Sequence, residues 1–136
     1  MKEKIELKKF VDEILLQLLP AAAAYKCKLE NYISPGVILV TDTEAFIFIF
    51  YRLLKLIIQS SYHSSIRISN LYEGDSLSII IKDNNNDYRG FISGKMEKHQ
   101  AIIRKAGGCL RFEFIEKKSI TVVLSFINQK TDQVKD

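Results

Sequence analysis

Leu77-Ser78-Ile79-Ile80-Ile81-Lys82 is followed directly by Asp83-Asn84-Asn85-Asn86-Asp87. The first segment is rich in branched aliphatic side chains, which is typical of a buried strand. In the second segment, every side chain can hydrogen-bond nearby backbone, so on its own it is typical of a polar turn between a strand and a helix. The rest of the chain can be ordered outward from this junction.

Three more strands and one helix are expected around the junction. A strand over 66–71 precedes it and is joined to it through Glu73-Gly74-Asp75, which is a turn signal. After a polar stretch that reaches Gly94, a helix is expected over 95–106, and Gly107-Gly108 ends it. Alternating apolar residues then predict strands that begin at Leu110 and Ile120.

The first half of the chain predicts two helices and two strands. Apolar residues recur at three- and four-residue steps over 7–19, and Pro20 is expected to end or kink this helix. The β-rich segments 28–33 and 37–41 flank Ser34-Pro35-Gly36, so we expect a hairpin. A second helix should begin at Thr41, Asp42 or Thr43 and continue to about residue 60.

This order predicts an α+β fold, a two-layer sandwich in which about three helices cover one face of a mixed sheet. A chain of 136 residues that is 47% hydrophobic fits a single domain over 1–136. We expect its core to span about 5–127. The polar tail, 128–136, is expected to be disordered.

Charge and cysteine usage narrow the class of protein. The net charge of +4 is mild and the cations are scattered among acidic residues, which argues against a nucleic-acid partner. Cys27 and Cys109 have no metal-ligand spacing, so we expect two buried thiols in a reducing, cytoplasmic setting. The apolar run from Ala45 to Ile58 is shorter than the roughly 20 residues that span a bilayer.

The order of elements and the run Asp83-Asn84-Asn85-Asn86-Asp87 after a strand resemble the ATP-binding domain of sensor histidine kinases, over about residues 5–127. Family members carry a helix motif, N-L-L-x-N-A, whose last Asn holds magnesium. The matching stretch, 52–61, puts Ser60 at that position, and an ungapped count from Asp42 puts Leu56 there. Neither side chain is a good ligand for a hard cation.

The next family motif, D-x-G-x-G, matches the polar run after the strand. Asp83 corresponds to the carboxylate that accepts from the adenine amino group, and Asn84 follows it. Asn85 and Asp87 stand where the family has glycine, so added side chains would narrow the pocket. The resemblance implies a candidate remnant nucleotide site.

The third family motif, G-x-G-L, begins the helix that cradles the phosphates. Counting back from Gly107-Gly108 places it at 93–96, where Gly94 is the one glycine. The interval 86–93 is too short for the flexible lid of the family. Gly94 and Ser60 therefore complete the set of candidate remnant residues.

No catalytic residue and no metal ligand is expected. The histidine that sensor kinases phosphorylate is usually followed by an acidic residue, and neither His63 nor His99 is. We therefore expect His63 to be a loop residue and His99 to lie on a helix surface. No triad, zinc spacing or pair of carboxylates accompanies them.

The leading hypothesis is a degenerate, non-catalytic module of two-component signalling that needs no cofactor. Its partner would be a histidine kinase, a phosphotransfer domain, a response regulator or a second copy of the chain. The alternative is a functional ATP-binding domain of a sensor histidine kinase, with ATP and Mg²⁺ as cofactors. An anti-sigma-type switch of the same fold ranks lower, because it would also need the missing Asn and glycines.

The apolar run over 46–51 suggests where a protein partner would bind. A helix turns only one face toward its sheet, so at least one or two of these six residues should lie on the outer side. Exposed apolar residues of this kind tend to mark a protein contact. The competing interpretation is that neighbouring elements cover them all.

Overall fold

The computed structural model describes residues 2–87, 96–116, 118–127 and 129. The elements in chain order are β1 (Glu3–Glu6), α1 (Leu7–Ala24), β2 (Lys28–Asn31), β3 (Ile38–Thr41), α2 (Thr43–Gln59), β4 (Ser65–Glu73), β5 (Ser76–Asp83), α4 (Met96–Lys105), β6 (Gly108–Glu116) and β7 (Ser119–Phe126). Within these residues, no helix is both long enough and apolar enough to cross a membrane.

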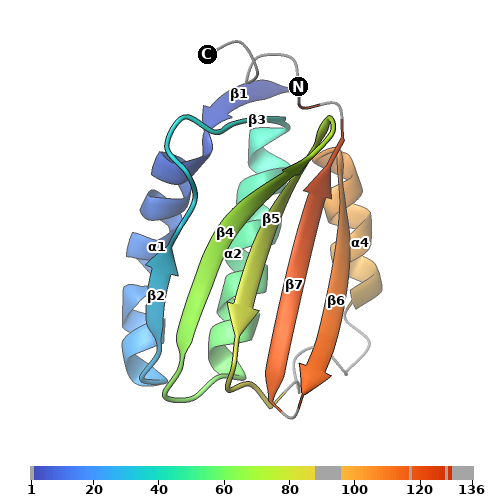
Figure 1. Ribbon diagram of the computed structural model, residues 1–136. Coiled ribbons are helices and arrows are strands. Elements are labelled where there is room, and N and C mark those ends of the chain that lie inside the picture. The colour runs from blue at the N-terminus through green and yellow to red at the C-terminus, as the bar shows by residue number, and fades with distance from the viewer. Residues whose placement is uncertain (1, 88–95, 117, 128, 130–136) are drawn as a thin grey trace.

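The molecule has two layers. A five-stranded sheet has the order β2-β4-β5-β7-β6, and α1, α2 and α4 lie together on one of its faces (Figure 1). The β2–β4 pair is parallel, while β4–β5, β5–β7 and β6–β7 are antiparallel. The predicted α+β sandwich with a mixed sheet is therefore confirmed.

The central helix, α2, packs its inner face on the sheet. The Asp42 carboxylate accepts from the backbone N–H of Ala45 at 3.2 Å, which satisfies a free donor in the first turn and confirms the predicted start of the helix. Seven α2 side chains are buried: Phe46, Ile49, Phe50, Leu53, Leu54, Ile57 and Ile58. The ring of Phe46 lies 6.0 Å from that of Phe10 in α1 and 5.9 Å from that of Phe126 in β7. The Phe46 side chain thus contacts both the neighbouring helix α1 and the sheet.

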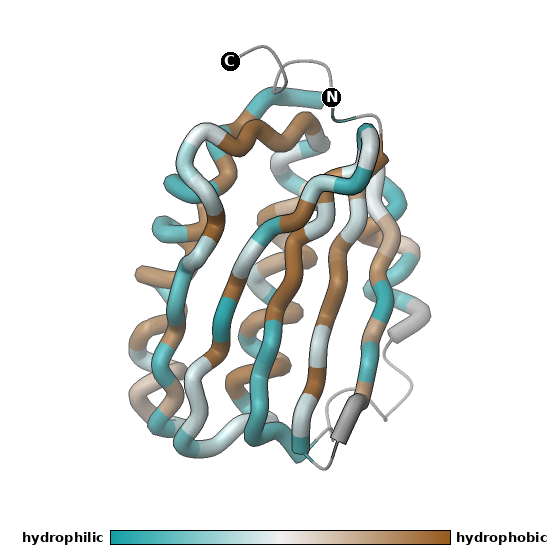
Figure 2. The backbone as a smooth tube through the Cα atoms, viewed as in Figure 1, coloured by the Kyte–Doolittle hydropathy of each residue, from teal (hydrophilic) through white to brown (hydrophobic). Residues whose placement is uncertain are grey.

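Of the two outcomes expected at Pro20, an end to the first helix is wrong, because α1 continues to Ala24 with Pro20 inside it. Proline leaves the carbonyl four residues earlier, that of Leu16, without its helical donor. Leu16 and Pro20 are both exposed, so water can bind that carbonyl. The alanines that follow have the highest helix propensity of all residues, which favours another turn. Teal and brown alternate along α1, as expected of an amphipathic helix (Figure 2).

The expected hairpin between the second and third strands is also wrong. β2 pairs with β4, whereas β3 pairs with β1 in a separate two-stranded sheet, and β1 has no counterpart in the sequence prediction. The Lys8 ammonium of α1 donates to the carbonyls of Asn31 and Ile33 at 3.3 and 3.1 Å. These contacts direct the chain over α1 instead of back along β2.

The two cysteines and the start of the tail differ in part from expectation. Cys27 is half-buried but Cys109 is exposed, so the prediction of two buried thiols is wrong; Cys109 lies on β6, at the edge of the sheet. Gln129 is buried, and its side-chain amide pairs with the backbone of Val40 at 2.8 and 3.0 Å. Residues 128 and 130–136 of the predicted disordered tail lie outside the described residues.

Two substitutions on α2 distinguish the contributions of its inner and outer faces to stability. Phe46→Ala should lower the free energy of unfolding by about 3–5 kcal/mol, because it leaves a cavity between α1, α2 and the sheet. Phe48→Ala, on the outer face, should lower it by less than about 1 kcal/mol. Urea denaturation of both variants measures the difference, and equal losses would show that the two faces are assigned wrongly.

Candidate functional site

Asp83 ends β5 on the side of the sheet that the helices cover. Ile79, Ile81 and Asp83 alternate along the strand toward the core, and the carboxylate is therefore buried, with 1% of the residue exposed. A buried carboxylate needs hydrogen-bond partners. Its partners come from three nearby residues.

Protein donors occupy both oxygens of this carboxylate. Oδ1 accepts from the Ser64 hydroxyl and from the backbone N–H of Asn85, the latter at 3.2 Å. Oδ2 accepts from the Asn86 side-chain amide at 3.0 Å. Hydrogen bonds to a charged acceptor are stronger than those between neutral groups, so this cluster fixes the end of β5.

The polar run after Asp83 crosses to the end of α2. The Asn86 amide also donates to the carbonyl of Ile57 at 3.0 Å, a carbonyl in the last turn of the helix that also accepts from the backbone N–H of Ser60 at 3.2 Å. The backbone N–H of Asp87 donates to the carbonyl of Ser60 at 2.9 Å. Asn85 exchanges two hydrogen bonds with the backbone of Tyr62. We call residues 83–87 with these contacts the strand–helix clamp.

The clamp brings together most of the candidate remnant residues. Asp83, Asn85, Asp87 and Ser60 meet at the end of α2, and Asn84 is exposed beside the Ser119 hydroxyl at 3.3 Å. The backbone N–H of Ser60 bonds the carbonyls in the last turn of α2, so this residue caps the helix. Gly94 lies outside the described residues.

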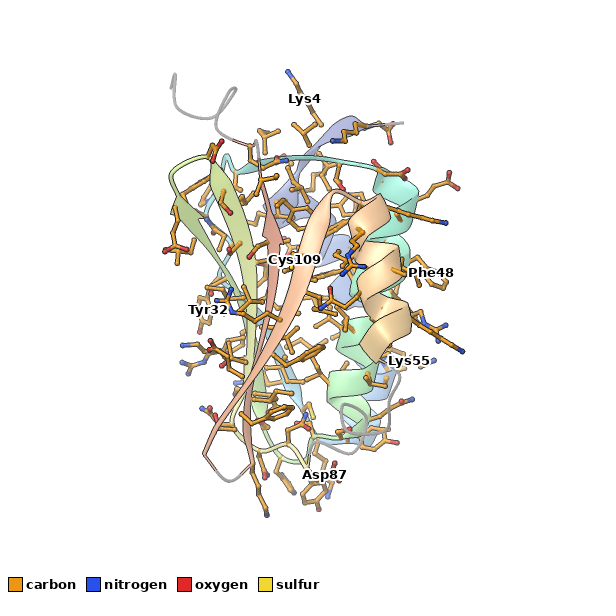
Figure 3. All side chains as sticks on the ribbon, turned by 90° about the vertical axis from the view of Figure 1, so that its right-hand side faces the viewer. Lys4, Tyr32, Phe48, Lys55, Asp87 and Cys109 are labelled. Atoms are coloured by element: carbon orange, nitrogen blue, oxygen red, sulfur yellow. The ribbon has the colours of Figure 1, made fainter. Side chains whose placement is uncertain are left out.

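A hollow lies away from the strand–helix clamp, on the face of α2 that points away from the sheet. Its volume is about 580 Å³. We call it the α2 groove, and its lining residues are Gln17, Ile47, Phe48, Tyr51, Arg52, Lys55, Leu56, Gln59 and His99. Phe48 and Lys55 lie on this outer side in Figure 3, while Asp87 lies at the lower end of the molecule. Asp83 is not among the lining residues.

The α2 groove contains two cations, and each lies beside an aromatic ring. The Arg52 guanidinium lies 5.2 Å from the centre of the Phe48 ring, and the Lys55 ammonium lies 5.9 Å from the centre of the Tyr51 ring. Each cation sits four residues after its ring, on the same side of the helix. Neither cation forms an ion pair with a carboxylate in the described part of the chain.

A second hollow, of about 480 Å³, adjoins the start of α2. Its lining residues are Asp42, Glu44, Ala45, Phe48, Ile102 and Lys105. Phe48 lines both hollows. It therefore lies between the start of α2, where Glu44 lines the second hollow, and the middle of α2, where Arg52 lines the α2 groove.

The exposed apolar residues were predicted by helix geometry, and the groove around them was not. Ile47 and Phe48 are 41% and 48% exposed, which confirms that one or two residues of the run 46–51 lie on the outer side. Arg52 and Lys55 interrupt the apolar run of the sequence, and that interruption was the available signal for an outer face.

The two histidines differ in their exposure to solvent. His63 is exposed in a loop with a positive φ of 50°, as expected. His99 is 5% exposed and lines the α2 groove, so its assignment to the helix surface is wrong. The error arises because α4 packs against α2, and a single sequence does not show which side of α4 is covered.

The clamp makes a testable contribution to stability. Asp83→Asn replaces one accepting oxygen with a donor that would face the amides or hydroxyl of the clamp, so we expect the free energy of unfolding to fall by about 2 kcal/mol. Asn84→Ala, at the exposed neighbour, should change it by less than about 0.5 kcal/mol. Chemical denaturation tests both, and an unaltered stability of Asp83→Asn would contradict the clamp.

No family model matches the sequence, and no curated protein matches it. Solved structures of histidine kinases do match. The Acinetobacter baumannii histidine kinase AdeS aligns with a TM-score of 0.79 at 14% identity, over 96% of this chain and 68% of that chain. The nucleotide-free catalytic domain of histidine kinase ThkA gives a TM-score of 0.78 at 10% identity, over 94% of this chain and 97% of its own.

A third structure agrees. The mycobacterial sensor histidine kinase MprB aligns with a TM-score of 0.75 at 11% identity, over 95% of this chain and 99% of that chain. Identities this low establish a common fold and leave the activity open. From β1 to β7, this chain has the fold of the catalytic domains of histidine kinases.

Proposed function

We propose that this chain is a non-catalytic module of two-component signalling that uses a histidine-kinase fold for contacts with another protein. The proposed partner is a histidine kinase, a phosphotransfer domain, a response regulator or a second copy of the chain. Histidine kinase ThkA has been solved in complex with the response regulator TrrA, and histidine kinase QseC as its cytoplasmic segment. By analogy, we place this chain in the cytoplasm.

The burial and hydrogen bonding of the Asp83 carboxylate are the observation that carries the proposal. In the family that this chain resembles, the corresponding carboxylate accepts a hydrogen bond from adenine. Here it is buried, and Ser64, Asn85 and Asn86 donate to it. A nucleotide base would have to displace at least one of these charge-assisted hydrogen bonds, which opposes binding.

The residues near the expected metal position also fit Mg²⁺ poorly. Leu56, which the ungapped count assigns to that position, lines the α2 groove with an apolar side chain, and the other assignment, Ser60, caps the helix. Magnesium requires oxygen ligands, commonly carboxylates. The described residues contain no group of three or more His, Cys, Asp or Glu side chains that could hold a metal ion.

A functional ATP-binding domain is the second candidate, and the α2 groove is the observation in its favour. Its volume of about 580 Å³ lies in the usual range for small-molecule sites, and Arg52 and Lys55 would attract phosphates. Measured affinity for nucleotide separates the two candidates.

A calorimetric titration of the full chain with ATP and Mg²⁺ should show no saturable binding tighter than about 1 mM. A dissociation constant in the low micromolar range would refute the non-catalytic proposal. Arg52→Glu serves as the matched control: any weak binding that it removes arises from the α2 groove rather than from the strand–helix clamp.

A further inference from the structure

We infer that the outer face of α2 binds the same face of a second copy of this chain, in an antiparallel two-fold contact. The inference rests on the proposed function, because it names the protein that the interaction surface fits. It starts from the order of charged and aromatic side chains along one helix.

Glu44, Phe48 and Arg52 follow one another at four-residue steps on α2. Residues with this spacing lie on the same side of a helix, and the rise per residue places the first and last about 12 Å apart. The two hollows agree with this order, because Glu44 lines one, Arg52 lines the other and Phe48 lines both. The stripe is therefore acidic, aromatic and basic in turn.

The charges of this stripe remain available to a partner. Glu44 and Arg52 are exposed, and neither forms an ion pair within the described residues. The Arg52 guanidinium lies over the Phe48 ring at 5.2 Å, which restricts its position. A cation over a ring still has N–H donors that a carboxylate can accept.

A two-fold axis near Phe48 makes this stripe complementary to itself. In such a contact residue i meets residue j and residue j meets residue i. Antiparallel α2 helices would place Glu44 opposite Arg52 of the partner subunit, and Arg52 opposite Glu44 of the partner subunit. Ile47 and Phe48 of both copies would form an apolar centre between two ion pairs, which is the usual anatomy of an interface.

Other occupants match the stripe less well. A nucleic acid would meet Glu44 beside the cations, and a uniformly acidic helix would be repelled at the same residue. The exposed area of Ile47 and Phe48 favours an apolar partner surface, which a second copy supplies. An interface of ordinary size would cover about 800 Å² of each copy, roughly a tenth of the 7945 Å² surface.

The test is a charge swap measured by sedimentation equilibrium on the full chain. The unaltered chain should dimerise with a micromolar dissociation constant. Glu44→Arg and Arg52→Glu should each weaken the dimer about tenfold or more, because each places like charges opposite one another. The double variant, Glu44→Arg with Arg52→Glu, should recover affinity to within about threefold, because the swapped charges pair again.

A matched control uses the ion pair on β2 and β4. Arg67 and Glu30 form an ion pair at 3.1 Å within one copy, so Glu30→Arg and Arg67→Glu change the net charge equally without touching α2. They should leave the dimer unchanged. Phe48→Ala should weaken it about tenfold, as loss of a central aromatic residue does. Circular dichroism of each variant verifies that it folds.

Three outcomes would overturn the inference. They are a monomer at every concentration, single swaps without effect, and a double variant as weak as the single ones. The nucleotide titration is a separate readout. A monomer that binds no nucleotide leaves the proposed function in place with a different partner, whereas micromolar binding of ATP would refute that function whether or not the dimer forms.

Discussion

The buried side of α2 packs on the five-stranded sheet, and the position of every other functional feature depends on that contact. Seven of its side chains are buried, and Phe46 contacts rings of α1, α2 and β7. Burying a side chain of this size stabilises a fold by about 1.5–3 kcal/mol, so any rotation of the helix would be costly. The inner face therefore determines which residues remain outside.

The strand–helix clamp is the polar counterpart of this apolar contact. A charged carboxylate at the end of β5 and the backbone carbonyls in the last turn of α2 both need hydrogen-bond donors when they are buried. Asn86 satisfies both, because its one amide group donates to Asp83 and to Ile57. Residues that resemble a nucleotide motif in sequence thus hold a strand to a helix in the structure.

The outer face of α2 connects the proposed function to the inferred dimer. Aromatic residues that are exposed on a helix cost solubility, and a charged stripe beside them restricts which surfaces they can contact. The clamp and the α2 groove lie on different parts of the same helix. A fold that resembles a nucleotide-binding domain can therefore present a protein-binding surface with its core intact.

Local pattern alone predicted the extent of α2, the strands β4 to β7 and the two-layer class, because periodicity reports which face of an element is buried. It also indicated that Ile47 or Phe48 would be exposed. It did not predict the pairing of β2 with β4 or of β1 with β3, or the burial of His99, and it did not decide whether α1 continues through Pro20. Those features depend on partners far apart in the chain. The α2 groove has the same origin: its residues come from α1, α2 and α4, and only their packing brings Gln17, Arg52 and His99 to one surface.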